Sequence, residues 1–530
     1  MNDWTNRFVE SFMTIWIFGL MSVFVGCSTN ITEKASDDHQ VNSAPAGSGD
    51  VLSPEDEYWQ VMLHGDTRVG YKHLKTVLIR EDESDFLSCS GEMEMRVQRG
   101  SEISEMKMEL ASVELPTGGL VRFTSKTVMG PVPRISKGNY DKNAGKLLID
   151  LVTPRGEQPV KMAWQKDWGG FFTGEISLNR NPMNPGEVRS FQSLEPLSLQ
   201  VARTRLKALQ YEKTSLLSGD ADLLKIQMTV DLGEGNKLMS YLWTEKGSRI
   251  LKETVPQLGI EVYRTTREIA LDVESRPTFN LDEMSLVRIA RPLENAHQLR
   301  RIVYRIHLPG EPGVKSNDAA GVFLDDGGQT VSALEEGIVE VTVCALRPDQ
   351  ALPNDFPGFE PVGDDDRLPN NTIQSEDSRI RAMAMSVAQE EKDPWRLAIA
   401  LESLVHRKIQ KKNFTQAFAT AAEVVETLEG DCSEHAVLLA ALCRARDIPA
   451  RTAIGLVYFD REQAFAGHMW NEVWIQDRWI PLDATIGAGG IGAAHLKVSV
   501  SNLKGISPYS TFLPVIRLLG GVSLEIVEME

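Results

Sequence analysis

The order of elements between Gly430 and Thr485, a helix and then two strands, constrains the fold more than any other feature of the chain. Good helix formers fill residues 436 to 446, and Ile448-Pro449 ends the run. Cys432 comes just before this run, so it lies in the first turn of the predicted helix. Unpaired backbone N–H groups and the positive end of the helix dipole favour a thiolate at that position. The pattern predicts Cys432 as a nucleophile.

Two alternating segments follow this helix. Residues 467 to 475 alternate in the manner of a β-strand, with His468 and Trp470 on one face. A second short strand, residues 479 to 482, ends at Asp483. If the turn between them has two residues, Asp483 lies opposite Trp470 or the residue two positions further on, and on the face of His468. A three-residue turn without a bulge places Asp483 on the other face.

With the two-residue turn, the three polar side chains form a nucleophile, a base and an orienting acid. Cys432 would attack a carbonyl carbon, His468 would take and return the proton, and Asp483 would hold the imidazole in the required tautomer. The Cys432 backbone N–H is a candidate donor to the oxyanion, and Trp395 and Gln410 are candidate side-chain donors. The sequence therefore predicts Cys432, His468 and Asp483 as the catalytic residues.

The same residues stand in four motif blocks that resemble the bacterial transglutaminase-like superfamily, a branch of the papain-like cysteine enzymes. The blocks are Gly-Asp-Cys-Ser-Glu-His-Ala at 430 to 436, the run at 441 to 451, His-Met-Trp-Asn-Glu-Val-Trp at 468 to 474, and Trp-Ile-Pro-Leu-Asp-Ala-Thr at 479 to 485. The resemblance implies a papain-like α+β domain and acyl transfer through a thioester on Cys432. An amine acceptor would make the protein a transglutaminase, and water would make it a cysteine protease or amidase.

Other residues of this region have simpler interpretations. His435 could compete with His468 as the base or share a metal ion with Cys432, but no second Cys/His pair has the spacing of a zinc site. We therefore expect no metal and no cofactor. Cys443 is expected to fill the core as a small apolar residue. The alternative to an enzyme is a non-catalytic envelope protein that uses this fold for interaction, which would need none of the three catalytic residues.

The length of 530 residues exceeds what one hydrophobic core normally serves, so two or three domains are expected. A net charge of −18 and a pI near 5.1 argue against nucleic acid or an anionic membrane surface as the main partner. Short alternating segments dominate from Tyr58 to about Val273, which indicates an antiparallel β domain, either a half-barrel or a sandwich. The expected partner is a protein or peptide substrate.

The predicted fold class is α+β, with antiparallel β structure first and the papain-like domain last. Our predicted limits are 55–280 for the β domain, 281–374 for a small β module and linker, 375–515 for the transglutaminase-like domain, and 516–530 for a C-terminal strand that closes its sheet. The acidic run 364–366 is typical of a solvated linker, with calcium binding as a second interpretation. Cys89 and Cys344 could form a bridge, but we expect both to be free.

The N-terminus indicates export. An apolar run from Phe12 to Val25 has the length of a signal-peptide core and is followed by Gly26-Cys27-Ser28. This ending resembles a bacterial lipoprotein cleavage site, which implies lipidation of Cys27 after removal of the leader. We expect residues 1–27 to be the leader and residues 28–54 to be a disordered tether. The lipid would anchor the protein in a membrane of the cell envelope.

Overall fold

The computed structural model describes residues 55–99, 102–128, 133–153, 156–233, 237–272, 279–280, 286–308, 322–335, 337–350, 356–411, 418–505, 511–512, 514–515, 518 and 521–530. The predicted leader with Cys27 and the predicted tether lie outside these described residues. None of the helices within them is long and apolar enough to span a membrane.

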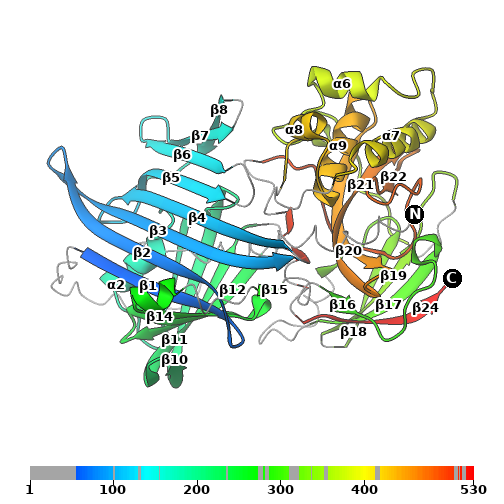
Figure 1. Ribbon diagram of the computed structural model, residues 1–530. Coiled ribbons are helices and arrows are strands. Elements are labelled where there is room, and N and C mark those ends of the chain that lie inside the picture. The colour runs from blue at the N-terminus through cyan, green and yellow to red at the C-terminus, as the bar shows by residue number, and fades with distance from the viewer. Residues whose placement is uncertain are drawn as a thin grey trace, which may run out of the picture.

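The first part of the chain forms one large antiparallel sheet, as the alternating pattern predicted (Figure 1). Its strands are β1 (Glu55–His64), β2 (Thr67–Glu81), β3 (Ser84–Arg99), β4 (Glu102–Glu114), β5 (Leu120–Val128), β6 (Arg134–Asp141), β7 (Lys146–Thr153), β8 (Gly156–Ala163), β9 (Val188–Leu194), β10 (Val201–Leu216), β11 (Gly219–Asp231), β12 (Lys237–Glu245), β13 (Arg249–Val255) and β14 (Ile260–Thr265). The short β15 (Phe279–Asn280) pairs with β3 in parallel. A hairpin turn at Gly65-Asp66 joins β1 to β2.

Pairing of β1 with β14 makes the two halves of this sheet continuous. The strand order is β8-β7-β6-β5-β4-β3-β2-β1 and then β14-β13-β12-β11-β10-β9. Helix α2 (Thr173–Arg180) contacts the sheet through buried polar groups: Tyr58 of β1 donates to Glu175 over 3.3 Å, and Thr173 donates to Glu114 of β4 over 3.0 Å. Helix α3 (Arg267–Leu271) and the 3-10 turn η3 (Pro256–Leu258) complete the described elements of this domain.

A small four-stranded sheet follows. It consists of β17 (Arg301–His307), β18 (Gln329–Glu335), β19 (Ile338–Cys344) and β24 (Ser523–Met529), in the order β18-β19-β17-β24. The C-terminal strand was expected to close the sheet of the last domain, but it pairs with β17 instead. The alternating pattern of β24 identifies it as a strand, and pairing across more than 200 residues has no local signal in the sequence.

The last domain places helices on one side of an antiparallel sheet (Figure 1). The helices are α6 (Ser378–Ala384), α7 (Pro394–Lys408), α8 (Ala421–Thr427) and α9 (Cys432–Ala445), and the strands are β16 (Val287–Arg288), β20 (Ala450–Phe459), β21 (Ala464–Ile475), β22 (Arg478–Leu482) and β23 (His495–Ser501). The 3-10 turns η4 (Ala296–Gln298) and η6 (Asp364–Asp366) lie between β16 and α6 in the chain. Strand β16 comes from the segment predicted as small module and linker, and it pairs with β21 of the last domain. The predicted domain limits stay predictions.

Helix starts follow the expected capping chemistry. Asp393 caps α7, its side chain accepts the Arg396 N–H, and Pro394 occupies the first turn, where a missing N–H costs nothing. Helix α8 begins at Ala421, with Thr420 as its cap. Residues 412–417 lie outside the described part of the chain.

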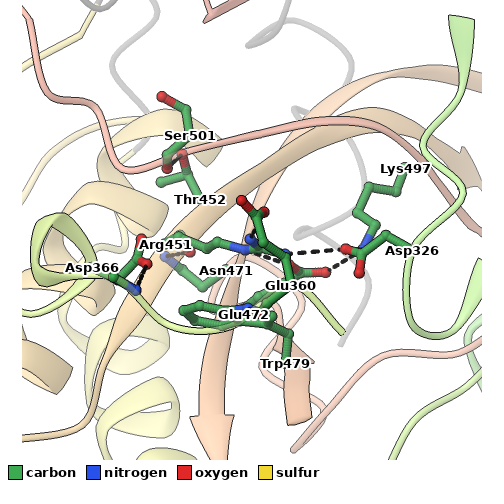
Figure 2. Close-up of polar contacts among 11 residues, drawn as sticks. Asp326, Glu360, Asp366, Arg451, Thr452, Asn471, Glu472, Trp479, Lys497 and Ser501 are labelled. Carbon is green, nitrogen blue, oxygen red and sulfur yellow. Dashed lines mark hydrogen bonds and ion pairs between the residues drawn. The ribbon is translucent and has the colours of Figure 1, made fainter. Parts of the chain in front are cut away.

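A buried ion network fixes the small module to the last domain (Figure 2). Arg451 of β20 contacts Glu472 of β21 over 2.8 Å, Asp326 over 3.1 Å and Glu360 over 3.0 Å. Lys497 of β23 contacts both Asp326 and Glu472 over 2.8 Å. Although burial opposes it, the charges of Glu472 and Asp326 raise the pKa of Lys497 above its usual value. Three strands of the last domain therefore share one set of charges with the loops that carry Asp326 and Glu360.

Candidate active site

The backbone before α9 is shaped so that Cys432 can begin the helix. Asp431 is the N-cap: its side chain accepts the Ser433 N–H over 2.8 Å, while Glu434 accepts the Asp431 N–H over 2.9 Å. This reciprocal capping box satisfies two donors of the first turn. Gly430 has φ +147°, and a Cβ there would lie 2.3 Å from the Glu434 Cβ, so only glycine fits. The predicted helix start at Cys432 is confirmed.

The hairpin after α9 has the two-residue turn on which the triad prediction depended. Ile475 pairs with Arg478, and the intervening Gln476 and Asp477 have φ values of 51° and 59°. Positive φ at both turn residues is the type I′ pattern, which matches the twist of the two strands. Leu482 is the last paired residue of β22 and lies opposite Asn471. Because Asp483 comes next, the hairpin carries it back toward His468.

His468 and Asp483 form a buried pair. The His468 Nε2 atom lies 2.8 Å from Asp483 Oδ2, and each side chain is 1% exposed. The other carboxylate oxygen, Oδ1, accepts the backbone N–H groups of Thr485 over 2.8 Å and Ile486 over 3.3 Å. Although burial alone would raise it, the charge and hydrogen bond of His468 hold the pKa of Asp483 well below its usual range. Asp483 is therefore ionised and oriented toward the imidazole.

The sulfur of Cys432 lies next to the strand that carries His468. The Met469 backbone N–H hydrogen-bonds to the Cys432 thiol, and Met469 directly follows His468 in β21. Three residues after His468, Asn471 donates to the Ala436 carbonyl of α9 over 2.8 Å. Helix and strand are thus fixed side by side, and the structure brings the three predicted residues to one place.

The protonation state of Cys432 differs from the expectation. Burial raises the pKa of the Cys432 thiol well above its usual value, and the charge of Asp431 raises it further. The Met469 N–H acts in the opposite direction, as a helix start does, but does not outweigh burial. The resting group is therefore a thiol rather than the predicted thiolate. Sequence patterns show the helix start, but the depth of burial comes from the surrounding domain.

Three polar side chains at this site, two of them buried, have no local signal in the sequence. His495, the first residue of β23, places Nε2 3.3 Å from Asp483 Oδ2. Glu402 of α7 accepts the Asp483 N–H over 3.1 Å and the Gly489 N–H over 2.9 Å. Burial, with a contribution from the charge of Asp483, raises the pKa of Glu402 to about 7. His297 of η4 lies with its ring centroid 5.6 Å from that of His495.

The remaining predicted residues take structural positions. His435 is fully buried, and its Nδ1 atom lies 2.5 Å from the Asp431 carbonyl, one turn back in the chain. Cys443 is fully buried in the core, as predicted. Cys89 and Cys344 are both buried, and the structure does not join them in a disulfide. Trp395 is half-buried in α7 and Gln410 is exposed beyond its end, and their role as oxyanion donors stays a prediction.

The acidic run at 364–366 forms the η6 turn. Asp366 accepts the Gly363 N–H over 2.9 Å, and Asp365 accepts from Lys504 over 2.9 Å. These contacts give the two carboxylates a structural role in holding the turn and the loop that follows β23. They do not bear on the calcium interpretation.

One set of side chains among the described residues has the composition of a metal site. Ligand atoms of His468, Asp483 and His495 all lie within 4.8 Å of one another. Two atoms bound to one tetrahedral zinc at bond lengths of about 2.0–2.1 Å lie about 3.3 Å apart. The 2.8 Å between His468 and Asp483 is shorter and is the length of a charge-assisted hydrogen bond. The arrangement fits hydrogen bonding better than it fits a bound zinc ion.

Comparison with known proteins agrees with this geometry. Residues 381–484 match the family model of the transglutaminase-like superfamily, and this range contains Cys432, His468 and Asp483. A search of curated proteins gave no match to the chain.

Solved structures show only weak likeness. A proposed cysteine protease from Cytophaga hutchinsonii has a TM-score of 0.25 and 13% identity over 44% of this chain and 85% of that one. A β-barrel-like protein with a domain of unknown function from Brucella abortus has a TM-score of 0.27 and 8% identity over 40% and 94%. A proposed protease from Parabacteroides distasonis has a TM-score of 0.18 and 9% identity over 70% and 68%. These structural scores carry no argument. The family match identifies residues 381–484 as a transglutaminase-like domain.

Proposed function

We propose that this protein is a cysteine enzyme that transfers the acyl group of a protein or peptide amide through a thioester on Cys432. The observation that carries the proposal is the 2.8 Å contact of His468 Nε2 with Asp483 Oδ2, next to a cysteine that begins a helix. A buried histidine oriented by an ionised aspartate, beside a thiol, is the constellation that nucleophilic catalysis requires. A purely structural role would explain none of these positions.

The first half-reaction consumes an amide and releases an amine. The Cys432 sulfur forms a bond to the amide carbon while its proton passes to His468 Nδ1, the ring nitrogen that does not face Asp483. The backbone N–H of Cys432 would stabilise the resulting oxyanion. His468 then gives its proton to the departing nitrogen as the carbon–nitrogen bond breaks, which leaves a neutral imidazole and a thioester. Asp483 stays ionised and stabilises the transient imidazolium.

The second half-reaction decides the type of enzyme. An amine or a water molecule attacks the thioester carbon, and His468 takes a proton from it. The carbon–sulfur bond breaks and the sulfur regains the proton from His468. A primary amine gives a new amide, the product of a transglutaminase, and water gives a carboxylic acid, the product of a protease or amidase. Both reactions use the same three residues, so we propose the acyl-enzyme as the common step.

The resting thiol supports a mechanism in which proton transfer accompanies attack. Because burial raises the pKa of Cys432, a preformed thiolate does not accumulate near neutral pH. Its exposure of 2% also means that substrate must displace neighbouring side chains before it reaches the sulfur. Exclusion of water from the site favours transfer to an acceptor that binds in the same place.

We also propose that the protein acts outside the cytoplasm, anchored by a lipid on Cys27. Support comes from the apolar run and the Gly26-Cys27-Ser28 sequence that follows it. Replacement of Cys27 by alanine should move the protein from the membrane fraction to the soluble fraction. Retention of Cys27→Ala in the membrane fraction would count against the lipid anchor.

The test of the proposed reaction uses residues 28–530, a pool of glutamine-bearing proteins and a labelled primary amine. Mass spectrometry should find amine incorporation or new peptide termini with the native chain and neither with Cys432→Ala. Cys443→Ala is the matched control, since it removes a thiol from the same helix but from the core. Incorporation identifies a transglutaminase and new termini identify a protease. Equal activity of the native chain and Cys432→Ala would refute the role of Cys432, and neither product with the native chain would favour an interaction protein.

A further inference from the structure

The Asp483 carboxylate faces two histidines rather than one. Its Oδ2 atom lies 2.8 Å from His468 Nε2 and 3.3 Å from His495 Nε2. A carboxylate only accepts hydrogen bonds, so both imidazoles must present an N–H to the same oxygen. With Thr485 and Ile486 donating to Oδ1, four donors surround this carboxylate. Among the described residues that hydrogen-bond to the Asp483 carboxylate, only His468 and His495 donate from a side chain.

His495 sits in a closed pocket of rings. Its side chain is fully buried, and its ring meets Trp470 edge-on at a centroid distance of 5.3 Å, His468 at 6.2 Å and His297 at 5.6 Å. The Gly492 carbonyl also lies beside it. The titratable groups that face His495 are therefore Asp483, His468 and His297. Burial lowers the pKa of His297 to about 4 and also lowers the pKa of His495, so both rings are neutral near pH 7.

Stability alone does not explain a histidine at this position. Its Nδ1 atom is buried without a hydrogen-bond partner of normal geometry, which costs free energy that an apolar ring of the same size would avoid. The Trp470 ring packs edge-on against the His495 ring, and a phenylalanine would keep that ring contact. The contact that a phenylalanine cannot make is the one to Asp483.

We propose that His495 is a positioning residue, which fixes the Asp483 carboxylate so that Oδ2 stays aimed at His468 Nε2. This inference rests on the proposed function, because it assigns a role to the base and acid of that reaction. Without the second donor only the Thr485 and Ile486 N–H groups on Oδ1 oppose rotation about the Cβ–Cγ bond. Oδ2 is then held less firmly, and the His468 tautomer with the proton on Nδ1 becomes more populated. That tautomer presents a proton to Cys432 and cannot accept one. His495 would thereby keep His468 ready to act as a base.

Two substitutions separate the hydrogen bond from the volume of the ring. His495→Phe keeps a buried ring and removes the donor, whereas His495→Gln carries an N–H close to the position of Nε2. The first readout is the rate constant for alkylation of Cys432 by iodoacetamide, followed by peptide mass spectrometry, which needs no knowledge of the substrate. The second is the ¹⁵N shift of the His468 ring nitrogens in protein labelled at histidine, which reports the tautomer and would not change if His495 were only structural.

We expect His495→Phe to slow alkylation of Cys432 about tenfold, the effect of one hydrogen bond to a charged group, and to mix the His468 tautomers. His495→Gln should stay within about twofold of the native rate and keep the native tautomer. If His495→Phe fails to fold, His495→Asn, whose amide is too short to reach Asp483, should behave as described for phenylalanine. Native rates and tautomer in a folded donor-free variant would overturn the inference.

A further variant distinguishes this inference from the proposed function. His468→Ala should slow alkylation of Cys432 more than His495→Phe does, because it removes the base itself. If His468→Ala reacts at the native rate, the proposed function fails, and the inference about His495 fails with it. If His468→Ala is slow and His495→Phe is not, only the inference about His495 is overturned.

Discussion

The side chain of Asn471 donates a hydrogen bond over 2.8 Å to the carbonyl of Ala436, which joins strand β21 to helix α9. Asn471 follows His468 by three residues, and Ala436 follows Cys432 by one helical turn. The bond therefore fixes the register between the element that carries the sulfur and the element that carries the imidazole. Asn471 is fully buried, so no water molecule can replace this contact at low cost.

Replacement of Asn471 by leucine should lower both the stability of the domain and the reactivity of Cys432. The apolar side chain has a similar volume but removes the link to Ala436, so strand and helix can shift relative to each other. We expect a loss of about 1–3 kcal/mol in stability and a several-fold slower alkylation of Cys432. Asn139→Leu, on an exposed position of β6, is the control. An Asn471→Leu variant with native reactivity would show that this bond does not hold the site.

The role of Asp483 can be tested with an isosteric change. Asp483→Asn keeps the shape of the side chain but can turn an N–H toward His468, which favours the wrong tautomer. We expect the rate of Cys432-dependent acyl transfer to fall by roughly 10³–10⁴-fold, as in other enzymes that use such a triad. Asp477→Asn is a matched control, because Asp477 lies in the turn of the same hairpin at φ 59°, where asparagine is well tolerated. A loss below tenfold would show that Asp483 does not orient the base.

The ion network in Figure 2 predicts a strong coupling between the small module and the last domain. Glu472→Gln would remove a negative charge that both Arg451 and Lys497 contact in this buried site. We expect the free energy of unfolding to fall by about 3 kcal/mol, which would lower the midpoint of thermal unfolding. Glu528→Gln provides the comparison, since its pair with Arg301 is largely exposed and should contribute less than about 1 kcal/mol. Equal effects of the two changes would contradict this account.

Much of this site follows from local sequence patterns. The glycine, aspartate and cysteine before a run of helix formers give a capped helix start, and the predicted helix begins at Cys432. Alternation on both sides of Gln476-Asp477 predicts a hairpin, and the even number of residues in its turn places Asp483 on the same face as His468. Each of these features depends on residues close together in the chain, which is why the sequence could predict them.

The remaining features depend on contacts between distant segments. No motif in the sequence marks His495 or Glu402, and only the packing of β23 and α7 around Asp483 gives them partners. The pairing of β1 with β14 and of β17 with β24 likewise joins segments with no local signal for each other. The thiolate prediction failed for the same reason, because the burial of Cys432 comes from the whole domain.

A buried carboxyl in the β domain predicts a pH-dependent stability. Burial raises the pKa of Glu175 from 4.5 to about 8, with the charge of Glu253 as a smaller cause. Between these two pH values the folded chain holds a proton that the unfolded chain has lost, so stability falls as the pH rises from about 4.5 to 8. Below pH 4.5 both states hold the proton and the effect is absent.

Glu175→Gln removes this proton linkage and keeps an oxygen that can accept from Tyr58. We expect the variant and the native chain to have the same free energy of unfolding near pH 4.5. As the pH rises to 8, the variant should become more stable than the native chain by roughly 2–4 kcal/mol. Thermal unfolding of both proteins at pH 4.5, 6, 7 and 8.5 would measure the difference. A difference that does not depend on pH would contradict the assignment of the proton to Glu175.

The central claim is that Cys432 carries the acyl group, and detection of that covalent state tests it most directly. The native chain is mixed with a peptide substrate pool, quenched in acid within seconds and digested, and the peptide that contains Cys432 is examined by mass spectrometry. We predict an acyl adduct on Cys432 that hydroxylamine removes, as expected for a thioester, and no adduct on Cys443. Formation of product by the native chain without any adduct on Cys432, or with equal product from Cys432→Ala, would contradict the account.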